Sequence, residues 1–212
     1  ATTEIYTLSL HDALPIYSHQ LDDLVLQMME TELGGEQVYR TALTCAIHPD
    51  LKKEWEGYLE ETLAHQNVVR GICDALGLDP DAQSPTRAVV KHIGTSLVQA
   101  MQLAKKSGTP EAAQRVACEC VVHAETKDHA NWELLGQVAK VATGDLGHTL
   151  KVAHKAVEKE EDHHLYHTKG WCRELAIQAL GMPAVLPPPE EVKNVETAIG
   201  ASRAEQQRAA ML

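Results

Sequence analysis

The sequence predicts an all-α fold: an antiparallel four-helix bundle with an extra helix in the long connection between the second and third bundle helices. Apolar residues recur at helical spacing through several long stretches. Glycine and proline separate these stretches at the places where helices end. With 212 residues, 44% of them hydrophobic, the chain can bury one substantial core. No apolar run approaches the roughly 20 residues that a membrane span needs.

The first two bundle helices are expected to form a hairpin. One helix runs from Ser18, a plausible cap, to about Ile47, and His48-Pro49 stops it. The next begins at Asp50 and is closed by Gly77. The short turn makes the two helices antiparallel. The apolar face of the second helix consists of Leu51, Trp55, Tyr58, Thr62, His65, Val69, Ile72 and Leu76.

The connection and the second hairpin follow the same rules. A helix over residues 86–106 should bury Val89, Ile93, Leu97, Ala100 and Leu103 or Ala104. Thr109-Pro110-Glu111 supplies an N-cap, a proline at the first helical position and an acidic first turn, so a bundle helix begins here and runs to about Ala142. The last bundle helix extends to about Leu180 and is ended by Gly181 and Pro183.

Three regions follow from this organisation. Residues 1–16 lack the features of a signal peptide and show no sustained helical period, so we interpret them as a non-native or disordered segment outside the fold. The bundle occupies residues 17–182. Residues 183–212 contain a proline-rich linker and a tail that we expect to form a loose helix or an oligomer contact.

Charge and cysteine content restrict the partners. A formal net charge of −11 disfavours nucleic acid and anionic membranes. Five cysteines without a Cys-x-x-Cys pair favour buried reduced thiols in a cytoplasmic protein. We expect a homo-oligomer, with a dimer favoured.

Glutamate followed four residues later by histidine is the most informative motif, because this spacing places a carboxylate and an imidazole on one helix face. About one such pair is expected by chance, and we assign that role to Glu119 and His123. The three remaining pairs lie in separate predicted helices: Glu61 and His65, Glu125 and His129, and Glu160 and His164.

Position in the bundle indicates which of these groups converge. Glu160 and His164 continue the apolar stripe of the last helix, and Glu61 lies beside Tyr58 and His65. Counted from the turn at Pro49, Glu36 on the first helix is level with Glu61, and Glu32, one turn earlier, is its rival. Carboxylates and imidazoles at one buried level would repel and lose solvation unless cations paired with them. Two divalent ions, with oxygen and nitrogen ligands, suit iron or manganese.

The chain resembles the ferritin-like superfamily, in which two helices each give one Glu and two each give a Glu and a His. The segment from Pro49 to His65 is also similar to bacterial stress-associated ferritin-like proteins of the YciE/YciF type. The family pattern places Glu and His three residues apart, and among the candidate ligands only Glu161 and His164 have this spacing. The resemblance implies the metal ligands Glu36, Glu61, His65, Glu125, Glu160 or Glu161, and His164.

Several neighbouring residues have open roles. His129 is surplus to the family pattern and is either an added ligand or a group that holds a carboxylate. We interpret His163 and His167 as a solvated polar face. Tyr39 and Tyr58 are either core aromatics whose hydroxyls bond a ligand carboxylate or redox relays.

The expected function is that of a di-metal protein with two Fe ions, or Mn, or a mixed pair. It would oxidise metal while reducing O2 or H2O2, and the resemblance implies a role in stress or iron handling. A di-iron oxygenase uses the same ligands but needs an apolar channel to an organic substrate. A metal-free structural stress protein is the alternative from a different class.

Overall fold

The computed structural model describes residues 18–190, 202–204, 206–207 and 210–211. Five long α-helices occupy this part of the chain, and no strand occurs in it. The all-α prediction is therefore confirmed. Residues 1–16 and most of the expected tail helix lie outside the described residues. The helices are α1 (Ser18–Leu43), α2 (Pro49–Leu76), α3 (Pro85–Ser107), α4 (Pro110–Val141) and α5 (Gly144–Ala179).

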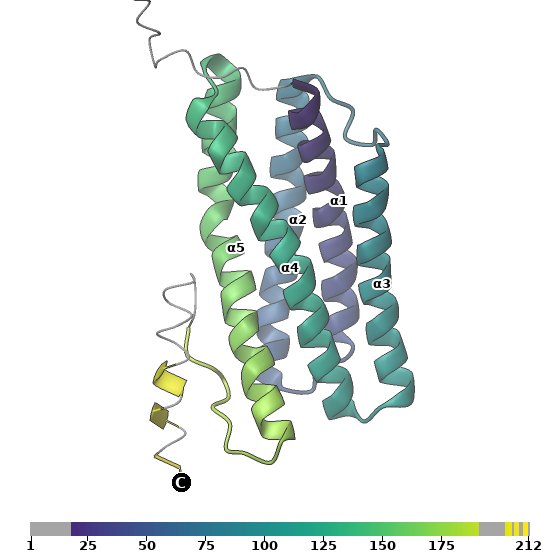
Figure 1. The fold of residues 1–212 in the computed structure, drawn as a ribbon, viewed down its shortest axis with the longest axis vertical. Helices are drawn as coiled ribbons and strands as arrows, with labels where there is room; N and C mark the ends of the chain where they lie inside the picture. Colours follow the sequence, from purple (N-terminus) through teal and green to yellow (C-terminus); the bar gives the residue numbers. More distant parts are fainter. Residues whose placement is uncertain (1–17, 191–201, 205, 208–209, 212) are drawn as a thin grey trace, which may run out of the picture.

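Four helices surround the core and the fifth covers one side of it (Figure 1). Helix α1 packs against α2 and α4, and α5 packs against the same two helices. Helix α3 lies outside this set, against α1 and α4. Because α3 runs back along the length of the bundle, α2 and α4 point the same way, and each neighbouring pair of the four is antiparallel.

Local signals set most helix ends where the sequence predicts them. The Thr109 side chain accepts a hydrogen bond from the backbone N–H of Ala112, and Gly77 ends α2 with a φ of 65°. The first helix ends earlier than predicted, at Leu43. The turn after it is held by α4, because Oε1 of Gln114 accepts hydrogen bonds from the backbone N–H groups of Ile47 and His48, each 2.7 Å long.

The buried side chains form two apolar clusters separated along the bundle. One, around Trp55 and Trp171, lies toward the α1–α2 turn. The other, around Trp132, lies toward the opposite end. On α2 the first cluster reaches Tyr58 and the second begins at Val69, so the residues between them occupy a level that neither apolar cluster fills.

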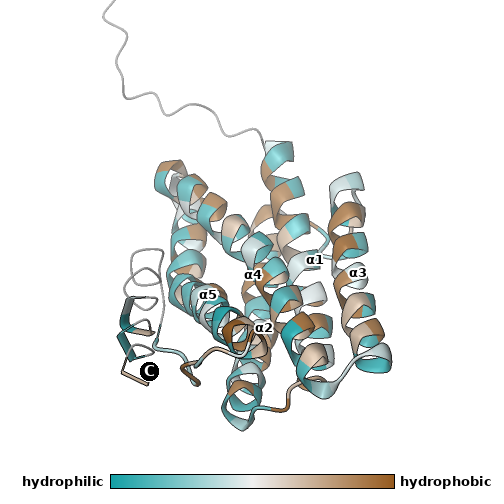
Figure 2. Cartoon of the chain, turned by 60° about the horizontal axis from the view of Figure 1, so that its bottom comes forward, coloured by the Kyte–Doolittle hydropathy of each residue, from teal (hydrophilic) through white to brown (hydrophobic). Residues whose placement is uncertain are grey.

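The predicted inward face of α3 is correct only in part: Leu97 and Ala104 are partly buried and pack against the apolar cluster around Trp55, but the other predicted residues do not. Val89, Ile93 and Leu103 are 58%, 51% and 66% exposed, and the buried side chains of α3 are instead Arg87, Val90 and Met101. Figure 2 shows the hydrophobic positions along the ribbon of α3 in brown. The guanidinium of Arg87 at the start of the helix points inward and pairs with Glu30, which orients α3 about its axis.

Two further expectations concern cysteines and membranes. Cys45, Cys73, Cys118 and Cys120 are buried, Cys172 is partly buried, and none forms a disulfide within the described residues. This agrees with the predicted reduced thiols. Across the described ranges, no helix is both long enough and apolar enough to cross a membrane.

Candidate metal centre

Between the two apolar clusters, every helix of the four-helix set places polar residues on its buried face. On α2, α4 and α5 two polar residues three positions apart continue the stripe: Thr62 and His65, Glu125 and Asp128, and Glu161 and His164. Helix α1 contributes Glu32. The charged and imidazole side chains of this layer are nearly inaccessible to solvent: Glu32 0%, His65 1%, Glu125 3%, Asp128 5%, Glu161 1% and His164 0% exposed.

Within this layer, five side chains form two overlapping groups with metal-ligand geometry. Glu32, His65 and Glu161 make one group, and Glu125, Glu161 and His164 make the other. In each group the ligand atoms all lie within 4.8 Å of one another. Glu161 belongs to both groups, so its carboxylate is placed to bridge two ions.

The Nδ1 atoms of both histidines face the buried carboxylates. Nδ1 of His65 lies 2.9 Å from Oε1 of Glu161 and 3.8 Å from Oε2 of Glu32. Nδ1 of His164 lies 3.6 Å from Oε2 of Glu125 and 3.8 Å from Oε1 of Glu161. The two imidazoles thus approach the shared carboxylate from α2 and α5.

The opposite ring nitrogens bind two other glutamates in a crossed arrangement. Nε2 of His65 lies 2.7 Å from Oε2 of Glu160, and Nε2 of His164 lies 2.6 Å from Oε2 of Glu61. The side chains of Glu160 and Glu61 are 42% and 40% exposed, so they lie at the edge of the buried layer. A carboxylate on one ring nitrogen orients an imidazole and raises its basicity as a ligand through the other nitrogen.

Several buried atoms of the layer have no hydrogen-bond partner. They comprise Nδ1 of His164, Oε2 of Glu32, Oε2 of Glu125 and Oε2 of Glu161, together with Oδ1 of Asp128. A single buried polar group without a partner costs about 1–3 kcal/mol. So many unpartnered acceptors at one level are explained if cations occupy the space between them.

The pKa shifts of the buried carboxyls also favour cations within the layer. Burial, with repulsion from Asp128 and Glu161, raises the pKa of Glu32 well above its usual range. Burial and the charges of Glu161 and Glu125 raise the pKa of Asp128 well above its usual range. Burial and Glu125 raise the pKa of Glu161 to about 8. Burial and mutual repulsion therefore favour the protonated form of these carboxyls when no cation is bound.

The pKa of His164 moves in the opposite sense to an isolated buried histidine. Burial lowers its pKa, but Glu125 and Glu61 outweigh that effect and raise it to about 10. In turn, the hydrogen bond from His164 lowers the pKa of Glu61. A metal ion at Nδ1 would replace the proton that the carboxylates now stabilise.

Glu36, predicted to join this layer, does not reach it. Its carboxylate accepts hydrogen bonds from Gln66 and Arg40, both 2.9 Å long, and these contacts lower its pKa. Glu32, the rival, occupies the buried position on α1. The prediction that Glu36 converges with the other carboxylates is therefore corrected in favour of Glu32.

His129 also lies outside both groups. Its Nε2 atom is 2.8 Å from Oδ1 of Asp162, and its ring packs 5.3 Å from the ring of Tyr166. It links α4 to α5 beside the layer. His167, predicted to be solvated, is only 2% exposed, because it packs beneath the segment after α5 and beside Glu54.

Tyr39 and Tyr58 belong to the apolar cluster around Trp55, and their rings pack against the ring of His164. The ring of Tyr58 lies 4.3 Å and that of Tyr39 6.1 Å from the His164 ring, measured between centroids. Burial raises the pKa of both phenols, helped by Glu125 at Tyr39 and by Glu54 at Tyr58. Both hydroxyls therefore stay protonated, as expected for core aromatics, and a redox role for them stays a prediction.

Sequence reasoning missed Asp128 and ranked Glu161 behind Glu160. A regular alternation of three- and four-residue steps would have selected Asp128. On α4 it runs through Val121, Glu125, Asp128, Trp132 and Leu135, all buried. On α5 two consecutive four-residue steps, from Ala153 to Val157 and from Val157 to Glu161, break the alternation, which would otherwise select the half-exposed Glu160. The buried stripe of α5 consists of Leu150, Ala153, Val157, Glu161, His164, Thr168, Trp171 and Leu175.

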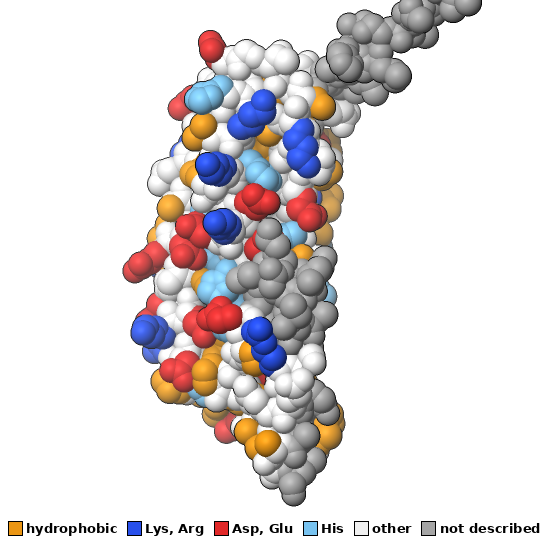
Figure 3. All heavy atoms as spheres, turned by 90° about the vertical axis from the view of Figure 1, so that its left-hand side faces the viewer, with side chains coloured by type: hydrophobic (Ala, Val, Ile, Leu, Met, Phe, Trp, Pro, Cys, Tyr) orange, Lys and Arg blue, Asp and Glu red, His pale blue; other side chains and the backbone are white. Residues whose placement is uncertain are grey.

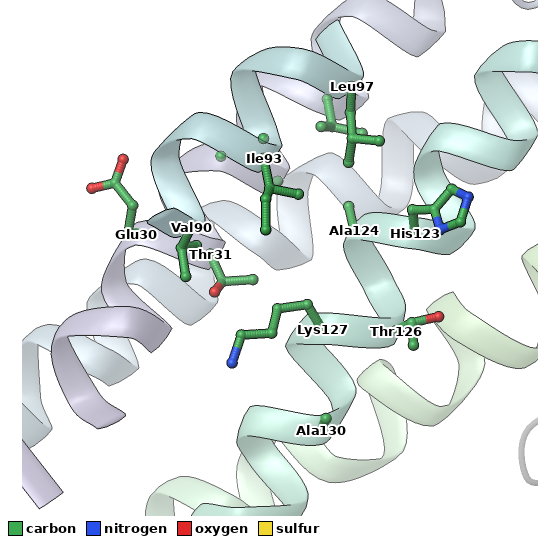
Figure 4. A pocket seen from close by; sticks show the side chains of 14 residues that line it. Glu30, Thr31, Val90, Ile93, Leu97, His123, Ala124, Thr126, Lys127 and Ala130 are labelled. Atoms are coloured by element: carbon green, nitrogen blue, oxygen red, sulfur yellow. The ribbon is translucent and has the colours of Figure 1, made fainter. Parts of the chain in front are cut away.

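An apolar cavity of about 590 Å³ lies between α1, α3 and α4 (Figure 4). Val90, Ile93 and Leu97 of α3 form one side, and the stem of Lys127 crosses another. None of the described residues that line this cavity belongs to the two metal-ligand groups. The cavity therefore lies beside the buried layer and does not include its ligand groups.

No protein-family model matches the chain, and comparison with curated proteins and with solved structures also returns no match.

Proposed function

We propose that this protein is a ferritin-like di-metal carboxylate protein that binds two iron ions, or manganese, or a mixed pair, and couples metal oxidation to reduction of O2 or H2O2. The observation that carries the proposal is the set of unpartnered carboxylate and Nδ1 atoms that converge on Glu161. A role in stress or iron handling, a homo-oligomeric state and a cytoplasmic location stay predictions.

The donor set fits two divalent cations. Glu32, Glu125, Glu161 and Asp128 would carry four negative charges once deprotonated, which two divalent ions balance. Two imidazole nitrogens complete a mixed oxygen and nitrogen set without thiolate, which favours iron or manganese over structural zinc. The ions would be held by Glu32 with His65 on one side, Glu125 with His164 on the other, and Glu161 between them.

The chain lacks one carboxylate of the ferritin-like pattern on α2 and has an additional buried carboxylate on α4. Thr62 stands three residues before His65, where the family pattern has a glutamate, and its hydroxyl donates to the backbone carbonyl of Tyr58. Asp128, three residues after Glu125, adds a buried carboxylate to the layer. In this proposal Asp128 supplies the fourth carboxylate that Thr62 does not.

The protein's own groups bind, orient and exchange protons. Glu160 and Glu61 hold the imidazoles of His65 and His164 so that each Nδ1 faces inward. Deprotonation of the buried carboxyls accompanies metal binding, because their raised pKa values keep protons on them in the metal-free protein. When bound, the ions would pass from the ferrous to the ferric state, or the manganese equivalent, and supply the electrons that reduce O2 or H2O2.

The two alternatives account for less of the geometry. A metal-free structural protein would leave the buried acceptors of Glu32, Glu125 and Glu161 without partners, at a cost in stability that apolar residues would avoid. An oxygenase needs an apolar path for its substrate, and the apolar cavity beside α3 is lined by other residues.

Metal content and oxygen consumption test the proposal. The protein is loaded anaerobically with Fe²⁺, desalted and analysed for iron, and oxygen uptake is then followed on exposure to air. We expect Glu161→Ala to carry two fewer ions per chain than the wild type and to lose Fe²⁺-dependent oxygen uptake. The control Glu36→Gln, on the same bundle but outside the layer, should keep both. Equal iron content in wild type and Glu161→Ala would refute the proposal.

A further inference from the structure

A second cluster of side chains that could hold a metal lies where α5, α2 and the segment after α5 meet, outside the buried layer. His163, His167 and Glu190 bring one ligand atom each to within 4.8 Å of the others. The two histidines are four residues apart, so they project from one face of the helix, and their ring centroids are 5.2 Å apart. Figure 3 shows this side of the molecule, where histidine and carboxylate side chains lie close together.

The segment after α5 delivers the third side chain. It folds back against the bundle because the backbone N–H of Val185 donates to Oε2 of Glu174, 2.9 Å away, and because Val185 is buried. Leu186 packs against the apolar cluster around Trp55. Held in this way, the segment places Oε2 of Glu190 2.8 Å from Nε2 of His163.

His167 is oriented from behind by a carboxylate. Its Nε2 atom lies 3.2 Å from Oε2 of Glu54, and the same oxygen accepts a hydrogen bond of 2.6 Å from Nε1 of Trp171. A carboxylate in this position is the usual support of a metal-bound histidine. The arrangement repeats on this face what Glu160 and Glu61 do for the buried histidines.

The surrounding charge attracts cations. A hollow of about 420 Å³ beside the cluster is lined by Asp50, Glu54 and Glu61, with Lys53 as the one basic side chain among its lining residues. Pro187 of the folded-back segment and His163 complete its rim. A hollow with three carboxylates and one ammonium group raises the local concentration of divalent cations.

We propose that His163, His167 and Glu190 form a binding site for a divalent cation of the zinc class, which clasps the segment after α5 to the helix. Two imidazoles and one carboxylate match the protein ligand set of open zinc sites. An ion pair between His163 and Glu190 alone, with side chains 33% and 73% exposed, would contribute little stability and would not require the oriented His167. The proposal does not depend on the metal content of the buried layer.

Equilibrium dialysis with Zn²⁺ tests the site. We expect His163→Ala and Glu190→Gln each to bind one Zn²⁺ fewer per chain than the wild type at micromolar free metal, through a loss of affinity of at least tenfold. Both positions are exposed enough for the variants to fold. His148→Ala, which removes an exposed histidine from the same helix, serves as the matched control and should bind as much Zn²⁺ as the wild type.

The test depends on the difference in bound Zn²⁺ per chain between the wild type and each variant. If the buried layer binds no Zn²⁺, the number of ions bound per chain is lower by the same amount in the wild type and in the variants. The difference of one ion between them is then unchanged. Equal Zn²⁺ content in the wild type, His163→Ala and Glu190→Gln would overturn the proposal. Loss of one ion in His148→Ala as well would also overturn it, since binding would then be unspecific surface coordination.

Discussion

Nε2 of His65 lies 2.7 Å from Oε2 of Glu160 on a different helix, although the sequence motif pairs His65 with Glu61. Each histidine therefore pairs with a glutamate of the other helix, because Glu61 of α2 contacts Nε2 of His164 on α5. The crossing ties α2 to α5 at the level of the buried carboxylates. It also turns both Nδ1 atoms inward, so under the proposed function Glu160 and Glu61 would orient the ligands rather than bind metal themselves.

Glu160→Gln should weaken metal binding without abolishing it. The amide can still contact His65, but it no longer raises the basicity of the imidazole, and loss of such a support costs about 10- to 100-fold in affinity. Calorimetric titration with Mn²⁺ measures the change, and Glu161→Gln should lose far more. A loss for Glu160→Gln as large as that for Glu161→Gln would instead identify Glu160 as a direct ligand.

Asp128→Asn should have opposite effects on the two forms of the protein. Without metal, burial and the charges of Glu161 and Glu125 raise the pKa of Asp128, so its carboxyl costs folding stability at neutral pH. The neutral amide removes that cost, and the melting temperature should rise. With metal, it removes a negative charge from the layer, so Mn²⁺ should bind at least tenfold more weakly. Glu133→Gln, at an exposed position on the same helix, is the control and should change neither value. A lower melting temperature in the metal-free variant would contradict the assignment.

The stability of the metal-free protein should fall as pH rises. Glu161 has a pKa of about 8 in the folded chain against an ordinary value of 4.5. Because the folded value is the higher one, its contribution is full below about pH 4.5 and is lost as pH rises through 8. At ~1.4 kcal/mol per pKa unit, this loss is on the order of a few kcal/mol.

Denaturant unfolding in the presence of a chelator, between pH 5 and pH 8, measures that dependence. Glu161→Gln should show a shallower decline than the wild type, since the amide does not titrate. The remaining slope belongs to other groups, including His164, whose raised pKa acts in the same direction above its unfolded value of 6.5. Parallel curves for the two proteins would show that the Glu161 carboxyl keeps an ordinary pKa.

The buried ion pair between Arg87 and Glu30 fixes the rotation of α3. Nε of Arg87 donates to Oε2 of Glu30 at 2.9 Å, and its Nη1 donates to the carbonyls of Pro80 and Ala82. Arg87→Met should destabilise the fold by roughly 3–5 kcal/mol, because it leaves a buried carboxylate unpaired. Thermal unfolding measures this, and the double change with Glu30→Met should recover part of the loss. No recovery would mean that the carbonyl contacts, not the pair, carry the effect.

Helix boundaries were predictable because their causes are local. The Thr109 cap and the left-handed Gly77 depend on a few neighbouring residues, and both appear as predicted. The face that α3 buries was not predictable, since Val89 and Ile93 form as regular a stripe as the buried set. A long-range contact between Arg87 and Glu30, far apart in the sequence, made the choice.

The sequence predicted a buried cluster of carboxylates and imidazoles, but it did not identify every residue of that cluster. Glu32 and Glu36 are one turn apart, and counting from Pro49 favoured Glu36 because it assumed that the helix continued to Ile47. The helix ends at Leu43, so that count misjudged the level. The crossed pairing of Glu61 and Glu160 could not be read from spacing, since it depends on the separation of α2 and α5.

The central claim is that two metal ions share Glu161 inside the bundle. Anomalous diffraction at the iron edge, from crystals of anaerobically Fe²⁺-loaded protein, tests it most directly. The account predicts two peaks on either side of the Glu161 carboxylate, one near Glu32 and His65 and the other near Glu125 and His164. Iron absent from this layer, or found only beside His163 and Glu190 at the surface, would contradict it.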